Sequence, residues 1–408
     1  MNILFLTDNF YPESNAPAKR TLEHCKEWSR QKHNITIITG VPNFPKGKVF
    51  DGYKNKIYQS EIIYDLKIKR VWTFISSNEG FFLRIFDYIS FLISSFFCGI
   101  FSKKHDIIIA TSPQFFTLLS GYFISLIRRT SLVLEIRDLW PESIVTVGAM
   151  SDKSMAIKVL KKISLFLYKK SDLIICVTKS FKKDLISRGI NHKKIKVVEN
   201  GFDLTKNLKP SLSIKEVEKK FKLSRNKFYV SFIGTIGMAH GLEIVLNAAL
   251  KVNDNVEFLI IGEGAKKTFL KNEVKKRKIK NIKFIDNLNW QEIVNINQLI
   301  NIHLVHLKKD VEFKKVIPSK IFESMALKKP IIMGVDGESR EIVNNAECAF
   351  NIEPENFNEL VNIINTARAD YTSLENMGEK GYNFLKKNFS RKILSNKMIK
   401  YLESVINY

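Results

Sequence analysis

The chain has 408 residues, which favours two or three domains, and its 45% hydrophobic and 26% charged residues are ordinary for a globular protein. Its formal net charge of +24 permits an anionic partner such as a nucleotide, a nucleic acid or an anionic membrane surface, although a Lys-rich composition alone would also produce it. Its four cysteines are far apart, which argues against a zinc site or a disulfide framework, and the first residues predict a strand rather than a signal peptide.

The first half of the chain alternates short apolar runs with segments long enough for helices. Continuous apolar runs bounded by polar residues are typical of parallel strands that are covered on both faces. They predict a doubly wound α/β domain over residues 1–200, with further strand-like runs within 62–75. The most apolar segment, 86–101, is too short for an ordinary spanning helix, which needs roughly 20 apolar residues. The predicted strands are 2–7, 35–39, 106–111, 131–136, 172–178 and 195–198.

The same alternation restarts after a Lys-rich interval at about 203–227. It predicts a second doubly wound domain over 201–385, followed by an amphipathic helix within 386–408 that we expect to pack toward the N-terminal domain. Open α/β sheets bind ligands outside the carboxyl ends of their strands, so two such domains predict a site in the cleft between them. The strands of the second domain are predicted at 228–233, 256–261, 282–285, 302–307, 330–335 and 349–352.

The loop after the first strand, NFYPESNAPAKR, contains no glycine. It therefore lacks the G-x-G-x-x-G pattern, which argues against a dinucleotide-binding dehydrogenase. Pro17 stands at a predicted first helical position, and Lys19 and Arg20 follow in the first turns. A helix N-terminus with nearby cations can bind an anion, so we select Asn15 and Arg20 as substrate-binding candidates. The alternative is a surface loop with a well-capped helix.

The stretch EIRDLWPESI follows a predicted strand and concentrates charge around Trp140. Its charged residues form either an internal salt-bridge network or a wall that binds a polar ligand. On the second interpretation Arg137 and Asp138 are catalytic candidates and Glu142 is a substrate-binding candidate.

Two glycine-containing loops follow strands of the second predicted domain. Glycine allows backbone N–H groups to approach a phosphate closely, or allows a tight turn on which a flat base can pack; a plain turn is equally consistent with the second loop. We therefore select Gly234, Gly237 and His240 from the first loop, and Gly262 and Gly264 from the second, as substrate-binding candidates.

The segment PSKIFES places Ser319, Lys320 and Glu323 where a helix should begin. Lys320 and Glu323 are three residues apart and so share one helical face. A nucleoside diphosphate-sugar fits this pattern, with the diphosphate near Lys320 and the ribose hydroxyls accepted by Glu323. Lys320 is therefore a catalytic candidate, because it would stabilise the charge on a leaving diphosphate, and Ser319 and Glu323 are substrate-binding candidates. No metal site is expected, because Asp-x-Asp is absent and His303 and His306 lie in a strand-like run, in which residues three apart point to opposite faces.

These motifs, in this order, resemble glycosyltransferase family 4, whose members have the GT-B fold of two Rossmann-like domains facing a cleft. ENGFD at 199–203 is similar to the family's interdomain segment, IGTIGMAHGLE to its phosphate loop, and PSKIFESMALKKPII to its nucleotide-binding helix. NFYPESNAPAKR and RDLWPESIVTVGAM resemble the branch of L-fucosamine (N-acetyl-L-fucosamine) transferases and related enzymes of O-antigen, capsule and colanic acid synthesis.

The resemblance implies retaining transfer from a nucleotide-activated, UDP-linked sugar, without a metal or another cofactor. It implies that Lys320 holds the phosphates, Glu323 the ribose, the 234–237 loop the diphosphate, and residues 262–264 with 286–288 the base. Two positions depart from the family pattern: Lys315 stands where the first of two glutamates eight apart is usual, and the phosphate loop lacks its Arg or Lys and has His240 nearby.

We expect front-face transfer in which the leaving phosphate oxygen takes the acceptor's proton, while Arg137 or Asp138 orients hydroxyl groups. The resemblance further implies a glycan on undecaprenyl diphosphate as acceptor and a location at the cytoplasmic face of the cell membrane. The apolar 81–101 segment and the basic amphipathic 155–172 segment could dock there. The alternative interpretation is that both segments are core helices whose lysine-bearing faces are exposed to solvent.

Two other functions are compatible with parts of the sequence. A UDP-N-acetylglucosamine 2-epimerase-like protein would share the two sheets, but it should carry several carboxylates and histidines for proton transfer. A basic nucleic-acid-binding protein would use the +24 charge, but it should show aromatics among its cations or a reading helix. We find neither pattern and expect no nucleic-acid partner.

Overall fold

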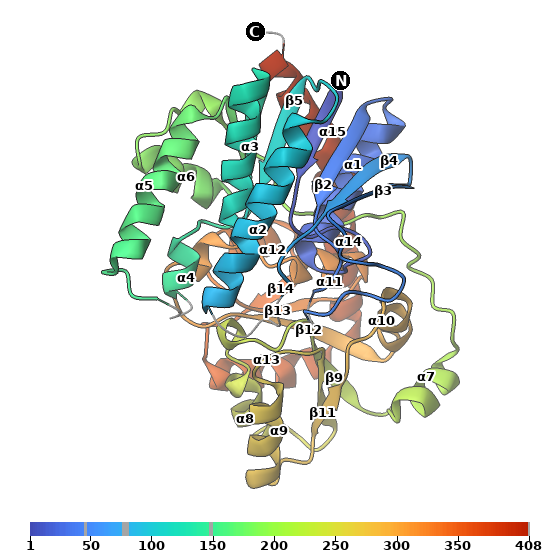
Figure 1. Ribbon diagram of the computed structural model, residues 1–408. Coiled ribbons are helices and arrows are strands. Elements are labelled where there is room, and N and C mark those ends of the chain that lie inside the picture. The colour runs from blue at the N-terminus through green and yellow to red at the C-terminus, as the bar shows by residue number, and fades with distance from the viewer. Residues whose placement is uncertain (45–46, 76–80, 147–149, 407–408) are drawn as a thin grey trace. The chain divides into compact units, whose positions relative to one another are not determined.

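The computed structural model describes residues 1–44, 47–75, 81–146 and 150–406, and the chain divides into two compact units (Figure 1). Unit 1 comprises Met1–Asn200 with Arg391–Tyr408, and unit 2 comprises Gly201–Ser390. Each unit has a sheet covered by helices on both faces, and together they form the GT-B architecture of two Rossmann-like α/β domains.

Within the described residues, unit 1 contains an eight-stranded sheet in the order β3-β4-β2-β1-β5-β6-β7-β8. All neighbouring pairs are parallel except β3 and β4. The central strands β5, β6 and β7 are mostly apolar and almost entirely buried, as the sequence pattern predicted. The strands are β1 (Asn2–Leu6), β2 (Asn34–Thr39), β3 (Tyr58–Ile63), β4 (Leu66–Val71), β5 (Ile107–Thr111), β6 (Ser131–Ile136), β7 (Leu173–Cys176) and β8 (Ile195–Val197).

The strand-like runs predicted within 62–75 belong to a hairpin that begins earlier, at Tyr58. Its two-residue turn consists of Tyr64 and Asp65, which both have positive φ (52° and 62°). Turns with two left-handed residues match the twist of antiparallel strands, although glycine and asparagine are the residues that usually signal them. The hairpin forms one edge of the sheet.

The helices of unit 1 include a long apolar one, α2, which has twenty residues and contains most of the apolar segment 86–101. Among the described helices, none is both long enough and apolar enough to cross a membrane. The helices are α1 (Ala16–Arg30), α2 (Phe81–Ile100), α3 (Phe115–Arg128), α4 (Glu142–Thr146), α5 (Met155–Lys170), α6 (Lys179–Ser187) and α15 (Arg391–Ile406).

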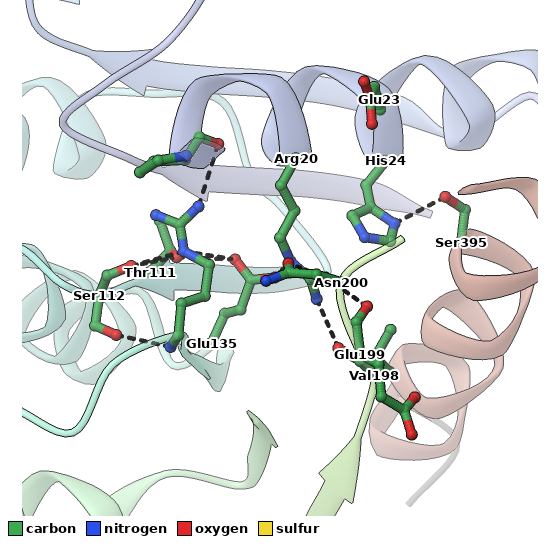
Figure 2. Close-up of polar contacts among 12 residues, drawn as sticks. Arg20, Glu23, His24, Thr111, Ser112, Glu135, Val198, Glu199, Asn200 and Ser395 are labelled. Atoms are coloured by element: carbon green, nitrogen blue, oxygen red, sulfur yellow. Dashed lines mark hydrogen bonds and ion pairs between the residues drawn. The ribbon is translucent and has the colours of Figure 1, made fainter. Parts of the chain in front are cut away.

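The last helix, α15, packs against α1 within unit 1, although 360 residues of chain separate them. Trp28 of α1 is fully buried and donates its indole N–H to the carbonyl oxygen of Ser395 at 3.1 Å. The ring of His24 lies 2.8 Å from the Ser395 hydroxyl (Figure 2). Arg391 pairs with Glu23 at 2.8 Å. These contacts tie the end of the chain to its beginning.

Unit 2 contains, within the described residues, a six-stranded parallel sheet in the order β11-β10-β9-β12-β13-β14. Its strands are β9 (Phe228–Ile233), β10 (Val256–Ile261), β11 (Ile282–Ile285), β12 (Ile300–His306), β13 (Ile331–Gly334) and β14 (Ala349–Asn351). Its helices are α7 (Ile214–Phe221), α8 (Glu243–Ala249), α9 (Lys267–Lys276), α10 (Trp290–Ile296), α11 (Lys320–Ala326), α12 (Glu338–Asn345), α13 (Phe357–Ala369) and α14 (Tyr371–Asn388). Helix α14 continues past residue 385, where we placed the end of this domain.

Candidate functional site

The pocket that contains Lys320 and Glu323 lies in unit 2 between β12, α10 and α11. Ser319 precedes α11 as its N-cap residue, and Lys320, Glu323, Ser324 and Leu327 then recur at spacings of three and four residues. This spacing places their side chains on one face of the helix. The structure therefore brings the predicted cation and carboxylate into one pocket, whose lining includes Ile233, Trp290, Ile293, His303, Leu304, Val305, Lys320, Glu323, Ser324 and Leu327.

The Lys320 side chain lies directly against the backbone of the loop after β9. Gly234 has a φ of 130°, which favours glycine, and a Cβ atom there would lie 2.8 Å from Lys320 Cε and displace the end of that side chain. The ammonium stands 4.9 Å from the centre of the Phe232 ring. Burial lowers the pKa of Lys320 to about 8, and the charge of Glu323 opposes that shift.

His240, from the same loop, is a neutral residue in this site. Its Nδ1 lies 3.3 Å from the carbonyl oxygen of His306, and its ring packs on Phe232. Burial, followed by the positive charge of Lys320, lowers the pKa of His240 to about 3. His240 therefore adds no positive charge for a phosphate near pH 7. A Cβ atom at Gly237 would make only ordinary van der Waals contacts, so the local packing does not demand glycine at that position.

Packing between two loops accounts for Gly262 and Gly264. A Cβ atom at Gly262 would lie 2.1 Å from the oxygen of Gly234, and one at Gly264 would lie 2.4 Å from the oxygen of Ile236. The backbone N–H of Ile236 also donates to the oxygen of Glu263 at 2.8 Å. The two glycines therefore hold the loop after β10 against the loop after β9, which carries Gly234.

Arg20 has a structural role in unit 1, and its role in substrate binding stays a prediction. It is 2% exposed, and its guanidinium donates to Glu135 at 2.9 Å and to the backbone oxygens of Val198 and Glu199 at 3.0 and 2.8 Å (Figure 2). A fourth bond, of 3.1 Å, reaches the side-chain oxygen of Asn200. All of these partners belong to unit 1, although they lie far from Arg20 in the sequence.

Arg137 and Glu135 belong to the same buried network, as one of the two interpretations of the EIRDLWPESI stretch predicted. Arg137 donates from Nε to the oxygen of Ser112 at 2.8 Å and from Nη1 to the oxygen of Pro17 at 3.1 Å. Burial lowers its pKa to about 10, so it stays cationic near pH 7. Despite burial, the cations Arg20 and Arg137 hold the pKa of Glu135 below its usual value.

The other three candidates of unit 1 have partners within the protein. Asn15 caps α1 by accepting the backbone N–H of Ala18 at 2.9 Å, and Glu142 pairs with Arg188 at 2.7 Å. Both side chains thus have local structural roles, and their substrate-binding roles stay predictions. The backbone N–H of Asp138 lies 3.4 Å from the hydroxyl oxygen of Ser112, beside Arg137.

Two family models match consecutive parts of the chain. Glycosyltransferase Family 4 matches residues 18–206, and Glycosyl transferases group 1 matches residues 213–384. The chain is a glycosyltransferase. This result favours the transferase over the epimerase-like and nucleic-acid-binding alternatives, and the boundary between the two matched regions falls close to the division between units 1 and 2.

Relatives and solved structures agree with this assignment. The glycosyltransferase is 24% identical over 339 residues to the putative colanic acid biosynthesis glycosyl transferase WcaI of Escherichia coli K12, which covers 80% of this chain and 81% of that protein. Its fold matches Anabaena HepE in complex with UDP-glucose (TM-score 0.71, 17% identity, 99% and 100% of the two chains). It also matches WaaG, a glycosyltransferase involved in lipopolysaccharide biosynthesis (TM-score 0.67, 11% identity, 97% and 98%).

Our sequence interpretation of the glycosyltransferase missed two residues of the Lys320 pocket. Trp290 begins α10, and His303 lies in the middle of β12; both line the pocket. We considered His303 only as a metal ligand. A polar residue between buried apolar residues was the available signal, because such a residue needs a hydrogen-bond partner.

Proposed function

We propose that this glycosyltransferase transfers a sugar from a UDP-sugar to a lipid-linked glycan in surface polysaccharide synthesis, with retention of configuration and without a metal or another cofactor. The observation that carries the proposal is the pocket in which Lys320 and Glu323 share one face of α11 beside Gly234. The UDP-glucose complex of HepE supports a UDP-linked donor, and the names of WcaI and WaaG support a surface-glycan pathway. N-acetyl-L-fucosamine is the sugar that we propose to test first.

In this proposal each pocket residue has a chemical task. Lys320 neutralises the diphosphate and stabilises the charge that develops on it as the glycosidic bond to phosphate breaks. Glu323 accepts hydrogen bonds from the ribose hydroxyls, and Ser319 and the backbone at Gly234 and Gly237 contact the phosphates. In unit 1, Asp138 orients hydroxyl groups of the reacting sugars, and the buried Arg137 holds the segment that carries Asp138 through its bonds to Ser112 and Pro17.

The proposed transfer uses the departing phosphate as the base. The acceptor hydroxyl approaches the anomeric carbon from the side that the phosphate leaves. The carbon–phosphate-oxygen bond breaks, the hydroxyl oxygen forms the new glycosidic bond, and its proton moves to the leaving phosphate oxygen. The products are the extended glycan and UDP, and no covalent bond to the protein forms.

A donor panel tests this function. The purified protein is incubated with UDP-, GDP- and dTDP-sugars, including UDP-N-acetyl-L-fucosamine, and with glycans on undecaprenyl diphosphate. We expect release of UDP, and a product with retained configuration at the new linkage, in the presence of EDTA. Release of UDP only after addition of a divalent cation, or a glycosyl-enzyme trapped on Asp138, would contradict the mechanism.

A lipid-linked acceptor requires contact with a membrane, and we propose a docking surface on unit 1. It consists of the exposed apolar residues of three neighbouring helices, α2, α3 and α5. Ring contacts join the helices: Phe96 meets Phe123 at 6.4 Å, and Tyr122 meets Phe166 at 5.3 Å. The exposed side chains of this surface are Phe86, Ile93, Phe97, Phe123, Leu126, Ile127, Met155, Val159 and Phe166.

Charge and shape add to this docking surface. Lys162 and Lys169 are exposed on α5, and a basic amphipathic surface can lie on an anionic bilayer without spanning it. A groove of about 500 Å³ between β3, β4 and α2 is lined mainly by apolar side chains, including Ile57 and Phe97. We infer that the protein works at the cytoplasmic face of the membrane, where this surface would contact anionic lipid.

Charge reversal on α5 should weaken membrane binding. We expect sedimentation with vesicles that contain anionic lipid at low salt. Binding of Lys162→Glu/Lys169→Glu should be weaker by at least about 30-fold, since loss of two surface lysines alone removes about 2 kcal/mol and the glutamates add repulsion. The matched control is Lys275→Glu/Lys276→Glu on α9, which changes the same charge at two exposed lysines of unit 2. Equal losses in both variants would show a net-charge effect and remove the docking surface from the proposal.

A further inference from the structure

His303 occupies a buried position on the floor of the Lys320 pocket. It lies in the middle of β12, it is 4% exposed, and it pairs in register with Ser231 of β9. Its Nδ1 lies 2.8 Å from the hydroxyl oxygen of Ser324 on α11. His303 is thus a polar link between the sheet and the helix that carries Lys320 and Glu323.

Two polar atoms at this position have no hydrogen-bond partner among the described residues: Nε2 of His303 and the hydroxyl oxygen of Ser231. Such buried groups are rare in folded proteins, because each costs about 1–3 kcal/mol when it is unsatisfied. His303, Ser324, Lys320 and Glu323 also line a cavity of about 20 Å³. A cavity needs only about 10–15 Å³ to hold one water molecule.

The charge state of His303 suits such a water. Burial, followed by the positive charge of Lys329, lowers the pKa of His303 to about 3. The neutral ring has one nitrogen that donates a hydrogen bond and one that accepts, and the contact with Ser324 uses Nδ1. Nε2 is therefore available to a second partner in either tautomer.

We propose that His303 is a positioning residue of the nucleotide-sugar site: it holds α11 through Ser324 and, together with Ser231, binds one water molecule in the cavity that Lys320 and Glu323 line. This inference deepens the proposed function and rests on it. Lys320 and Glu323 make the contacts with the donor, and His303 acts through them.

The bound water has a measurable consequence for Lys320. Two titratable groups lie near this ammonium: Glu323, which is on the same helix, and His240, which is neutral and belongs to the loop after β9. Lys329, beyond the far end of α11, acts on His303. A water nearby stabilises the ammonium and opposes the effect of burial, so losing the water should lower the pKa of Lys320. UDP binding needs the charged form and should therefore weaken as pH rises through the pKa of the free protein.

The test compares UDP affinity from pH 6 to pH 9.5 in the wild type, His303→Phe and His303→Asn. For His303→Phe, which fills the cavity with carbon, we expect the alkaline loss of binding to begin about one pH unit lower, and affinity to be about fivefold weaker at pH 8. His303→Asn retains a polar group and should restore the wild-type profile. Ser324→Ala, which removes only the link to α11, should weaken UDP binding about tenfold at all pH values.

The matched control is His24→Phe. His24 of unit 1 is also buried and lies 2.8 Å from the hydroxyl oxygen of Ser395, so it forms the same kind of His–Ser pair away from the pocket. It should lower thermal stability without moving the pH profile. If His303→Phe does not fold, the pKa of Lys320 in His303→Asn and Ser231→Ala is measured by the pH dependence of its acylation, followed by mass spectrometry without ligand.

The outcomes separate the two proposals. An unchanged pH profile in His303→Phe, or an unchanged pKa of Lys320 in Ser231→Ala, would overturn the inference while the UDP site stands. If the wild type binds UDP at no pH, the proposed donor fails; the acylation assay then still decides whether His303 and Ser231 control the pKa of Lys320.

Discussion

Replacing Lys320 by methionine should lower the turnover number of transfer by on the order of 10²–10³, which is the usual cost of removing one preorganised group that stabilises developing charge. Methionine retains most of the volume and packs against Phe232, so the fold should persist. The loss should fall on kcat more than on KM, because the charge on the diphosphate grows as the bond to the sugar breaks. The measurement is steady-state UDP release with a lipid-linked acceptor.

Lys329 provides a matched control for this experiment. It follows the other end of α11, outside the lining of the pocket, and burial, opposed by Glu375, lowers its pKa to about 8 as well. Lys329→Met therefore removes a comparable lysine close to the same helix, and its turnover should stay within about threefold of wild type. A Lys320→Met enzyme with normal kcat and a raised KM would show that Lys320 binds the donor equally in ground and transition states.

Arg20→Met should destabilise unit 1 by about 3–5 kcal/mol, the usual cost of breaking a buried ion pair by removing one partner. The variant leaves the carboxylate of Glu135, which is 1% exposed, without its closest cation, and it leaves the backbone oxygens of Val198 and Glu199 without a donor. The measurement is the free energy of unfolding from urea denaturation, followed by a probe in unit 1 such as Trp28 fluorescence.

Arg30→Met is the control, because Arg30 lies on the same helix with its side chain 56% exposed and should change stability by less than about 0.5 kcal/mol. The structural assignment of Arg20 would be wrong if Arg20→Met unfolded like the wild type but lost UDP binding. That pair of results would return Arg20 to the substrate-binding role that its position near the start of α1 first indicated.

Local pattern was sufficient for most of the fold. Uninterrupted apolar runs predicted the central strands of both sheets, because a strand buried on both faces has no polar positions to alternate with. The helix face shared by Lys320 and Glu323 was equally predictable, since spacing alone places residues three apart on one side. The hairpin of β3 and β4 was placed only approximately, because its turn uses Tyr64 and Asp65 rather than residues that signal such turns.

The roles of the charged residues in unit 1 could not be read from spacing. Arg20 and Glu142 follow the ends of strands, where binding residues gather, but their partners Glu135 and Arg188 are 115 and 46 residues away. A buried guanidinium must satisfy its donors wherever the packed chain supplies acceptors. Only the folded chain shows that the partners of Arg20 and Glu142 belong to the protein itself.

The two loops of unit 2 show the same division. The amino-acid order alone was enough to place glycines after β9 and β10 and a lysine at the start of α11. Which atoms those glycines make room for depended on three-dimensional packing: the Lys320 side chain at Gly234, and the backbone of the neighbouring loop at Gly262 and Gly264. Periodicity and residue type act over a few neighbouring residues, so the elements that depend on them can be predicted from the sequence. Steric fit and the pairing of buried charges depend on contacts between segments that are distant in the sequence. Such contacts form only when the chain folds, so they could not be predicted from local pattern.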